Sequence, residues 1–145
     1  TEIIEQIGAD VTINFKEKDP VSAILEATHG RGVDVAIEAL GTEATFQACL
    51  RVIKPGGTVS SLGVYAKDVV VPLDAFYAGL GDQKLVTTLC PGGKERMRRL
   101  MDVISTKRVD LRSMVTHRFK LERILEAYDF FSNQRDGVLK VAITP

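Results

Sequence analysis

Short apolar runs alternate with amphipathic segments along this chain. The runs Val33 to Ala39 and Thr58 to Val64 are rich in apolar and small residues, which is typical of strands buried on both faces of a parallel sheet. A further strand is predicted at Lys84 to Cys90, and the earlier run Val11 to Phe15 alternates polar and apolar residues as a short strand does. The pattern therefore predicts a strand at each of these four positions.

Helix-start signals separate the predicted strands. Asp19 followed by Pro20 favours a helix start, because the carboxylate can cap free backbone amides and proline at the first helical position loses no hydrogen bond. Thr42 can cap a second helix in the same way. Helices are predicted at Pro20 to His29, Glu43 to Val52, Asp74 to Gly79 and Lys94 to Thr106.

The carboxyl-terminal third repeats the alternation less regularly. Val115 to Phe119 is predicted as extended, Leu121 to Asn133 as helical, and Leu139 to Thr144 as extended. Strands that alternate with helices at this spacing predict an α/β fold with a doubly wound, mainly parallel sheet flanked by helices. The last two extended pieces fit that sheet least well.

Composition places the chain among ordinary globular proteins and argues against nucleic acid or membranes as partners. A length of 145 residues suits a single domain with a sizeable core. Lys and Arg total 19 and balance 19 Asp and Glu, so no overall field attracts nucleic acid or an anionic membrane. The apolar runs are far shorter than the roughly 20 residues that span a bilayer. No targeting segment is recognisable, and the two cysteines suit a reducing compartment, so a cytoplasmic location is expected.

Three small-residue corners follow the predicted parallel strands. They are Leu40 to Thr42, Gly63 to Tyr65 and Leu89 to Gly93, and ligands bind at such carboxyl-terminal strand ends in α/β sheets. Each corner alone could be no more than a tight turn. Three such corners in succession, whose small residues let a ligand approach the backbone, also favour a dinucleotide site. The glycine-rich G-x-G-x-x-G fingerprint of such sites does not follow any of the strands.

Residues for metal or covalent chemistry are few. Cys49 occupies an apolar helical position, and Cys90 ends a strand. With His29 and His117 they lack the Cys-x-x-Cys or His-x-x-x-His spacing of zinc sites, so the residues predict no metal site. The sequence also lacks the Ser-x-x-Lys and Gly-x-Ser-x-Gly motifs that indicate covalent catalysis.

The start of the helix at Lys94 carries two ambiguous features. Gly92-Gly93 could donate amides to an anion or merely form a turn. The basic side chains on this helix could be a solvated face or could contact a phosphate or an acidic partner; they are Lys94, Arg96, Arg98 and Arg99.

Five sequence blocks follow one another in the order found in zinc-dependent medium-chain alcohol dehydrogenases. They are GVDVAIEALG, VIKPGGTVSSLGVY, KLVTTLCPGGKERMRRLMDVI, VDLRSMVTHRF and LERILEAYDFF. The chain most resembles the tetrameric secondary-alcohol dehydrogenases of bacteria. The resemblance covers essentially the whole chain and corresponds to the carboxyl-terminal part of that family, from the second Rossmann helix onward. It implies one partial Rossmann-like domain over residues 1–145, truncated relative to the family and including the family's carboxyl-terminal segment at about 110–145.

The resemblance also implies which residues face a cofactor. The family transfers hydride between an alcohol and NAD or NADP, with zinc polarising the oxygen. The matching positions are Ala39, Leu40 and Gly41 near the adenosine, Gly63, Val64, Tyr65, Leu89 and Cys90 along the nicotinamide, and Lys140 near the phosphates. The family's zinc ligands and glycine-rich loop have no counterpart here. We therefore expect no zinc, no catalytic residue, weak or absent cofactor binding and no activity of this chain alone.

Three hypotheses for the role of the chain remain open at this point. It could be a dehydrogenase-derived cofactor domain, a module for oligomerisation or protein binding, or an incomplete gene product. The missing family strands would leave Val33 to Ala39 as an apolar edge, which Val11 to Phe15 or a second chain could cover. We expect a homodimer or larger assembly, with Lys84 to Thr88 as its seam and association with intact dehydrogenase subunits as a further option.

Overall fold

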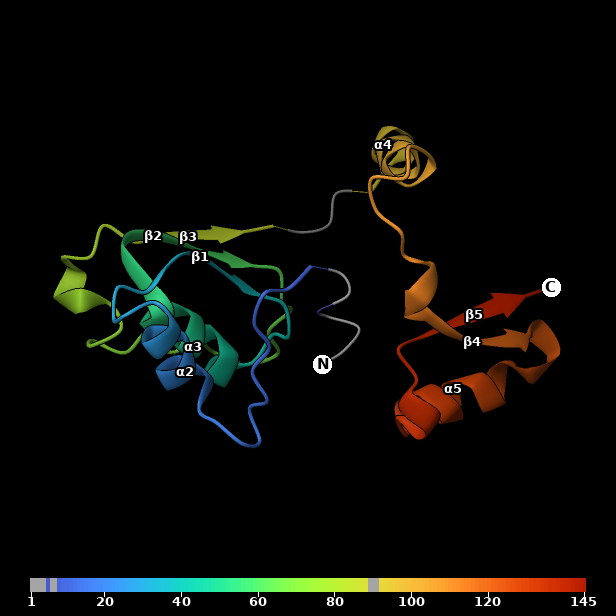
Figure 1. Cartoon of the computed structure of the whole chain (residues 1–145), viewed down its shortest axis with the longest axis horizontal. Coiled ribbons are helices and arrows are strands. Elements are labelled where there is room, and N and C mark those ends of the chain that lie inside the picture. Colours follow the sequence, from blue (N-terminus) through green and yellow to red (C-terminus); the bar gives the residue numbers. More distant parts are fainter. Residues whose placement is uncertain (1–4, 6–7, 89–91) are drawn as a thin grey trace. The chain divides into compact units, whose positions relative to one another are not determined.

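The computed structural model describes residues 5, 8–88 and 92–145 of the chain. It contains two compact units, which we call the three-stranded unit (residues 12–91) and the two-stranded unit (residues 1–11 and 92–145). Figure 1 shows the elements of each unit. Each unit is described by itself below, and the expectation that the whole chain forms one domain stays a prediction.

The three-stranded unit contains a parallel sheet. Strands β1 (Val33–Glu38), β2 (Ile53–Ser61) and β3 (Lys84–Thr87) lie in the order β1-β2-β3. The register places Ala36 opposite Val59, which in turn lies opposite Leu85. The α/β, Rossmann-like fold that the sequence predicts is thereby confirmed, although β2 begins earlier and β3 ends earlier than expected.

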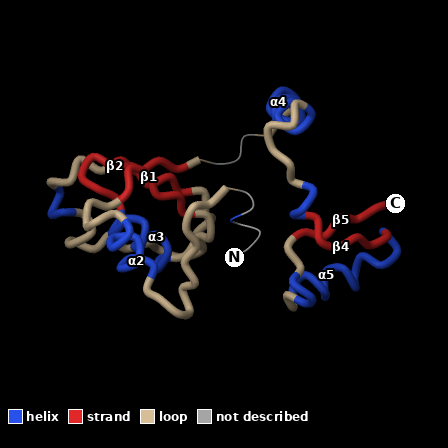
Figure 2. Tube along the Cα trace, viewed as in Figure 1, coloured by secondary structure: helices blue, strands red, loops and turns tan. Residues whose placement is uncertain are grey.

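Two helices cover one face of this sheet. Helices α2 (Pro20–Ala27) and α3 (Glu43–Val52) lie on the same side of the strands in Figures 1 and 2. Asp19 accepts a hydrogen bond from the backbone amide of Ser22 at 2.8 Å, and Thr42 accepts one from the amide of Thr45 at 3.2 Å. Both predicted N-caps are confirmed.

The core lies between these helices and the sheet. Its buried side chains are Ala36, Phe46, Leu50, Val52, Ile53, Val59 and Ala75. Strand residues alternate between faces, so Val35, Ile37 and Val86 point to the opposite face and are exposed. One face of the sheet is therefore covered within this unit, and the other is open and partly apolar.

The prediction of a strand at Val11 to Phe15 is wrong. Residues 11–14 have no regular structure, and Phe15, which is 74% exposed, begins a turn. The side-chain oxygen of Asn14 accepts a hydrogen bond from the amide of Lys16 at 3.1 Å, and this local turn competes with strand pairing. Among the described strands, β1 pairs with β2 alone. The segment therefore does not cover the outer edge of β1.

The predicted helix at Asp74 to Gly79 is shorter than expected. The structure has a single 3₁₀ turn, η1 (Tyr77–Gly79), in which Ala78 adopts a positive φ of 52°. A left-handed residue interrupts the regular α-helical hydrogen-bond pattern, so the helix does not form over the whole segment.

The two-stranded unit contains a β-α-β arrangement. Strands β4 (Val115–Lys120) and β5 (Lys140–Thr144) pair in parallel, and helix α5 (Ile124–Ser132) lies in the connection between them. One short 3₁₀ turn precedes β4, and two more lie in the connection on either side of α5. These turns are η2 (Arg112–Met114), η3 (Leu121–Arg123) and η4 (Arg135–Gly137). Phe130 of α5 packs against Phe119 and His117 of β4, with ring centroids at 5.7 and 4.7 Å. The predicted extended pieces are thus strands, and they form a sheet of their own.

Helix α4 (Lys94–Ser105) carries an apolar stripe. Its exposed apolar side chains are Met97, Leu100, Met101 and Ile104. Their spacing places them on one helix face. In the part of the chain that the structure describes, no helix is both long and apolar enough to cross a membrane.

Candidate functional site

A buried carboxylate organises the corner that follows β1. Glu38, the last residue of β1, is 1% exposed. Its Oε1 accepts hydrogen bonds from the backbone amides of Leu40 at 2.8 Å and Gly41 at 2.9 Å, and from Thr45 Oγ1 at 2.8 Å. The side chain therefore ties the corner to the first turn of α3.

The corner that follows β2 reaches the same carboxylate. The Tyr65 hydroxyl donates to Glu38 Oε2 at 2.7 Å and lies 2.8 Å from Ser61 Oγ, the last residue of β2. The Tyr65 ring packs edge-to-face on Phe46 with ring centroids 6.0 Å apart. The Leu62 amide also donates to the Glu38 backbone carbonyl at 2.7 Å. Both strand ends are thus joined by one hydrogen-bonded network, which we call the Glu38 network.

Two glycines allow the corners to pack against each other. A Cβ on Gly63 would lie 2.2 Å from Glu38 Oε2 and 2.4 Å from the Gly41 nitrogen. Gly41 has a φ of +87°, and a Cβ there would lie 2.4 Å from the Val64 carbonyl oxygen. The space beside each glycine is filled by the other corner, so the glycines serve a close backbone contact.

The network fixes the charge state of its carboxylate. Burial by itself raises the pKa of Glu38, but hydrogen bonds from Tyr65, from two backbone amides and from Thr45 outweigh burial and lower this pKa to about 2. Burial and the neighbouring Glu38 charge raise the pKa of Tyr65, despite its contact with Ser61. Burial, followed by the same charge, raises the pKa of the Cys49 thiol. At neutral pH the carboxylate is therefore ionised, and both neighbours are neutral.

The outward surface of the two corners is apolar. Leu40 is 69% exposed and Val64 is 83% exposed, and Ala39 is exposed as well. A hollow of about 600 Å³ runs along β1 beside α2 and α3, and its lining includes Ala39, Leu40 and Cys49. This volume falls in the range of small-molecule sites. The structure thus brings the first two predicted corners together and adds a hollow that the sequence did not predict.

The other predicted cofactor positions belong to different parts of the chain. Leu89 and Cys90 lie outside the described residues. Gly92 and Gly93 precede α4 and have open space beside their α-carbons. Lys140 is the first residue of β5 and belongs to the two-stranded unit.

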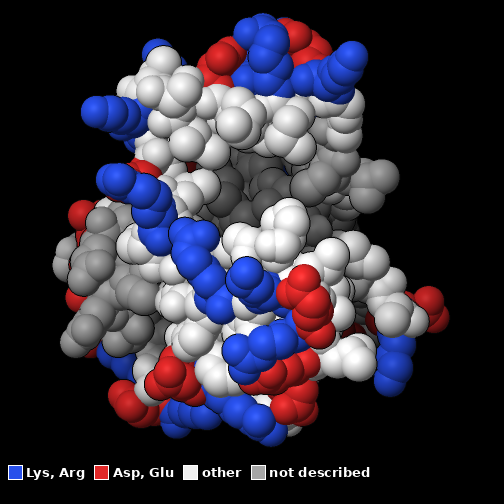
Figure 3. All heavy atoms as spheres, turned by 90° about the vertical axis from the view of Figure 1, so that its right-hand side faces the viewer, with Lys and Arg blue, Asp and Glu red and all other residues white. Residues whose placement is uncertain are grey.

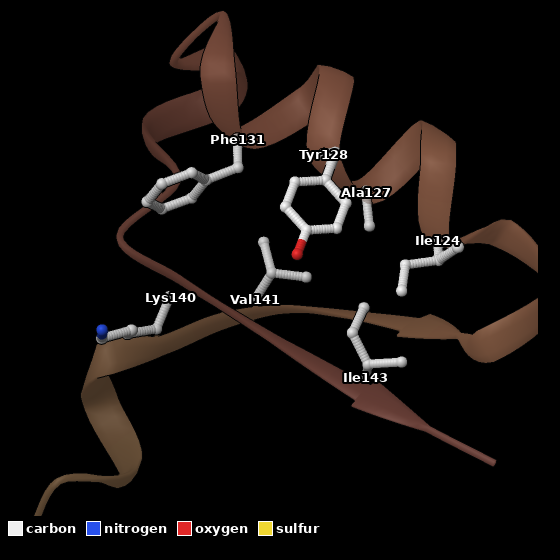
Figure 4. Close-up of a pocket in the computed structure, with 7 residues that line it drawn as sticks. All are labelled: Ile124, Ala127, Tyr128, Phe131, Lys140, Val141 and Ile143. Carbon is white, nitrogen blue, oxygen red and sulfur yellow. The ribbon is translucent and has the colours of Figure 1, made fainter.

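Lys140 lines an open apolar groove between α5 and β5. Figure 4 shows its side chain at one end of the groove, with the ammonium directed away from the apolar side chains. The groove has a volume of about 260 Å³, and its other lining residues are Ile124, Ala127, Tyr128, Phe131, Val141 and Ile143. No polar group among these offers a second contact to a phosphate except the Tyr128 hydroxyl.

Two of the four basic side chains of α4, Arg98 and Arg99, form ion pairs along their own helix. Arg98 lies 3.0 Å from Glu95 and 2.7 Å from Asp102, and Arg99 lies 2.9 Å from Glu95. Figure 3 shows basic and acidic side chains side by side on the face in view. These contacts favour the interpretation of a solvated helix face.

Metal-ligating side chains do not cluster among the described residues. No group of three or more His, Cys, Asp or Glu side chains there could hold a metal ion. His117 lies 2.9 Å from Thr116 Oγ1 and 3.4 Å from Asp136 Oδ2, a pair on the surface of the two-stranded unit.

Comparison with known proteins decides the family. Residues 1–106 match the sequence profile of the family described as zinc-binding dehydrogenase. The chain belongs to the zinc-binding dehydrogenase family. It is 62% identical to an alcohol dehydrogenase of Cupriavidus necator over 99% of its own length and 39% of that protein. It is also 32% identical to the NADP-dependent isopropanol dehydrogenase of Thermoanaerobacter brockii, over 94% of this chain and 40% of that one.

Solved structures of zinc-binding dehydrogenases share the fold. The zinc-dependent alcohol dehydrogenase 2 of Streptococcus pneumonia matches with a TM-score of 0.85 and 34% identity, over 98% of this chain and 40% of that chain. A zinc-binding dehydrogenase of Sinorhizobium meliloti bound to NADP matches with a TM-score of 0.82 and 28% identity, over 99% of this chain and 42% of that chain. The resemblance to medium-chain alcohol dehydrogenases, with the secondary-alcohol type among them, is confirmed. The chain spans about two fifths of the length of these relatives.

Proposed function

We propose that the paired corners after β1 and β2 form one wall of a nicotinamide dinucleotide site in an alcohol dehydrogenase. The supporting observation is that the Glu38 network holds these two corners together at the carboxyl ends of adjacent parallel strands, where α/β sheets bind ligands. The exposed side chains of Leu40 and Val64 offer apolar surface suited to a flat ring. The hollow beside Ala39 and Leu40 offers room for the adenosine end.

The described residues suit the rings of such a cofactor better than its phosphates. Phosphates are usually held by backbone amides at a glycine-rich turn and helix N-terminus. In the corners after β1 and β2, the amides of Leu40 and Gly41 already donate to Glu38. We therefore propose that the corners bind NADP or NAD weakly, with a millimolar dissociation constant. NADP is the first choice, because relatives 32% identical are named as NADP-dependent.

The reaction we propose for this wall is hydride transfer between a secondary alcohol and the nicotinamide. When bound, the cofactor supplies the hydride chemistry, and residues of this chain contribute apolar contact and orientation. The zinc that polarises the alcohol oxygen in the family would need ligands other than the described residues, among which no cluster fits a metal. We also propose a reducing, cytoplasmic location, since Cys49 is a free thiol.

A titration of the ¹⁵N-labelled chain with NADPH, followed by NMR, tests the wall. We expect shifts at the amides of Leu40, Gly41 and Val64 that saturate at millimolar concentrations. Leu40→Ser and Val64→Ser should each weaken the response, because each removes exposed apolar surface. Leu73→Ser is the matched control, since Leu73 is 73% exposed in the same unit and belongs to neither corner.

Two results of this titration would contradict the proposal. Shifts confined to other residues, or none at ten-millimolar nucleotide, would show that the corners do not face a cofactor. A micromolar dissociation constant would show that the chain also holds the phosphates.

A second candidate function is self-association, and the open sheet favours it. The outer edges of β1 and β3 have no strand partner among the described strands, and Ile37 on the open face is 65% exposed. Unpaired edges and exposed apolar patches favour association with other chains. We propose a homodimer or larger assembly with β3 as its seam, which could also accommodate intact dehydrogenase subunits. Light scattering that gives a single monomeric mass at high micromolar concentration would overturn this proposal.

A further inference from the structure

Glu38 is a buried charge, and no cation is among its hydrogen-bond partners in the described part of the chain. Its hydrogen-bond partners are two backbone amides, the Thr45 hydroxyl and the Tyr65 hydroxyl. The ion pairs among the described residues do not involve Glu38. Burying a carboxylate is unfavourable unless it is well hydrogen-bonded, so these four donors must together replace its lost hydration.

The four donors come from three different segments of the chain. The two amides belong to the corner after β1, Thr45 to the first turn of α3, and Tyr65 to the corner after β2. Tyr65 is 27 residues from Glu38 in sequence, so the network joins parts that local structure does not connect. One side chain therefore contacts both corners.

We propose that Glu38 is a positioning residue, which holds the Leu40 and Val64 corners in the arrangement that faces the cofactor. This inference rests on the proposed function, because the surface that Glu38 would position is the proposed cofactor wall. The contact between Glu38 and Gly63 supports it independently. Gly63 would clash with Glu38 Oε2 if it carried a Cβ, so the carboxylate is in direct contact with the second corner as well as the first. A hydrocarbon side chain of the same size could fill this space but could not accept the four hydrogen bonds.

Substitution by glutamine separates the charge from the shape. The amide oxygen of Glu38→Gln can still accept from Leu40, Gly41 and Thr45. The amide nitrogen can only donate, so the Tyr65 hydroxyl must accept from it and donate to Ser61 alone. The contact to the second corner is therefore reversed, while the volume of the side chain is preserved.

Titration of neighbouring groups does not obscure this comparison near neutral pH. Cys49 of α3 and Tyr65 are the titratable groups that face Glu38, and the pKa of each is raised. Both remain neutral between about pH 5 and pH 8. Differences between the wild type and Glu38→Gln in this range thus report the loss of the carboxylate charge.

The test measures amide hydrogen exchange and NADPH-induced NMR shifts of the whole chain. In Glu38→Gln we expect exchange at Leu40 and Gly41 to accelerate roughly tenfold, because hydrogen bonds to a charged acceptor are stronger than those to an amide. We also expect the Val64 amide resonance to move and the NADPH dissociation constant to rise roughly tenfold. Glu43→Gln is the matched control, since Glu43 is exposed on α3 and its carboxylate accepts a hydrogen bond from Gln47 rather than from either corner.

The outcomes distinguish the inference from the proposed function. Unchanged exchange at Leu40 and Gly41 with an unmoved Val64 resonance would overturn the positioning role. If the corners respond to Glu38→Gln but NADPH never shifts them, the positioning role stands and the cofactor wall fails. If Glu38→Gln does not fold, Tyr65→Phe decides: it should move Val64 while the Leu40 and Gly41 amides stay protected, and an unmoved Val64 would overturn the inference.

Discussion

Addition of a single methyl group at Gly63 should disrupt the contact between the two corners. In Gly63→Ala, the added Cβ would lie 2.2 Å from Glu38 Oε2, 2.4 Å from the Gly41 nitrogen and 2.6 Å from the Gly41 α-carbon. Cβ atoms essentially never approach other atoms closer than 3.0 Å, so the Gly41 nitrogen would have to move away by about 0.6 Å and Glu38 Oε2 by about 0.8 Å. Two of these neighbours are backbone atoms and cannot rotate away.

The magnitude follows from overpacking and from strained hydrogen bonds. Forcing an extra methyl group into a packed site costs about 1–3 kcal/mol. Separation of the corners also stretches the bonds that Glu38 accepts, each of which, being charged, contributes roughly 1.5–3 kcal/mol. We expect Gly63→Ala to lower the free energy of unfolding by about 3 kcal/mol. For a unit of this size, that corresponds to a fall in Tm of more than about 10 °C.

Thermal and urea unfolding, followed by circular dichroism, measures this effect. Gly92→Ala is the matched control: it adds the same methyl group, has nothing within 4 Å of the new Cβ and lacks a left-handed φ. The control should unfold within about 0.5 kcal/mol of the wild type. If Gly63→Ala is equally stable, the close contact between the corners is not a feature of the protein in solution.

Three further predictions concern pH, assembly and activity. The pKa of Glu38 falls from 4.5 in the unfolded chain to about 2 in the folded protein, so its ionised form contributes about 3 kcal/mol to stability above pH 4.5. This contribution is lost as the pH falls toward 2. The free energy of unfolding, measured by acid unfolding, should therefore decrease over this range, and Glu38→Gln should reduce that decrease. The Thr88 amide donates to the Ser61 carbonyl of β2, so the neighbouring Thr87 amide faces the outer edge of β3. Thr87→Pro removes that donor and should dissociate an assembly that pairs through β3, as measured by light scattering, whereas Thr87→Ala should not. An assembly that survives the proline would refute this seam. The chain alone should not oxidise 2-propanol with NADP and added zinc in a steady-state assay; zinc-dependent turnover that is lost when Cys90 is replaced would contradict this expectation.

Local signals in the sequence determined the position of most elements. Apolar runs predicted β1, β2 and β3, and the Asp19 and Thr42 caps predicted the starts of α2 and α3. These predictions succeeded because a cap bonds to an amide three residues away, so its partner is fixed by the chain itself. The same local logic failed at residues 11–15, because alternation describes a strand only where another strand is available to pair with it.

Only the tertiary structure decided what the corners do. The sequence presents Gly41 and Gly63 as small residues that could admit a ligand, and the structure shows each packed against the other corner. Glu38 was not singled out, because one acidic residue at a strand end carries no signal of burial. Its partner Tyr65 lies 27 residues away and approaches only because β1 and β2 are neighbours in the sheet. A buried carboxylate is stable only with its hydrogen-bond donors. Where these donors are distant in sequence, only the fold brings them to the carboxylate.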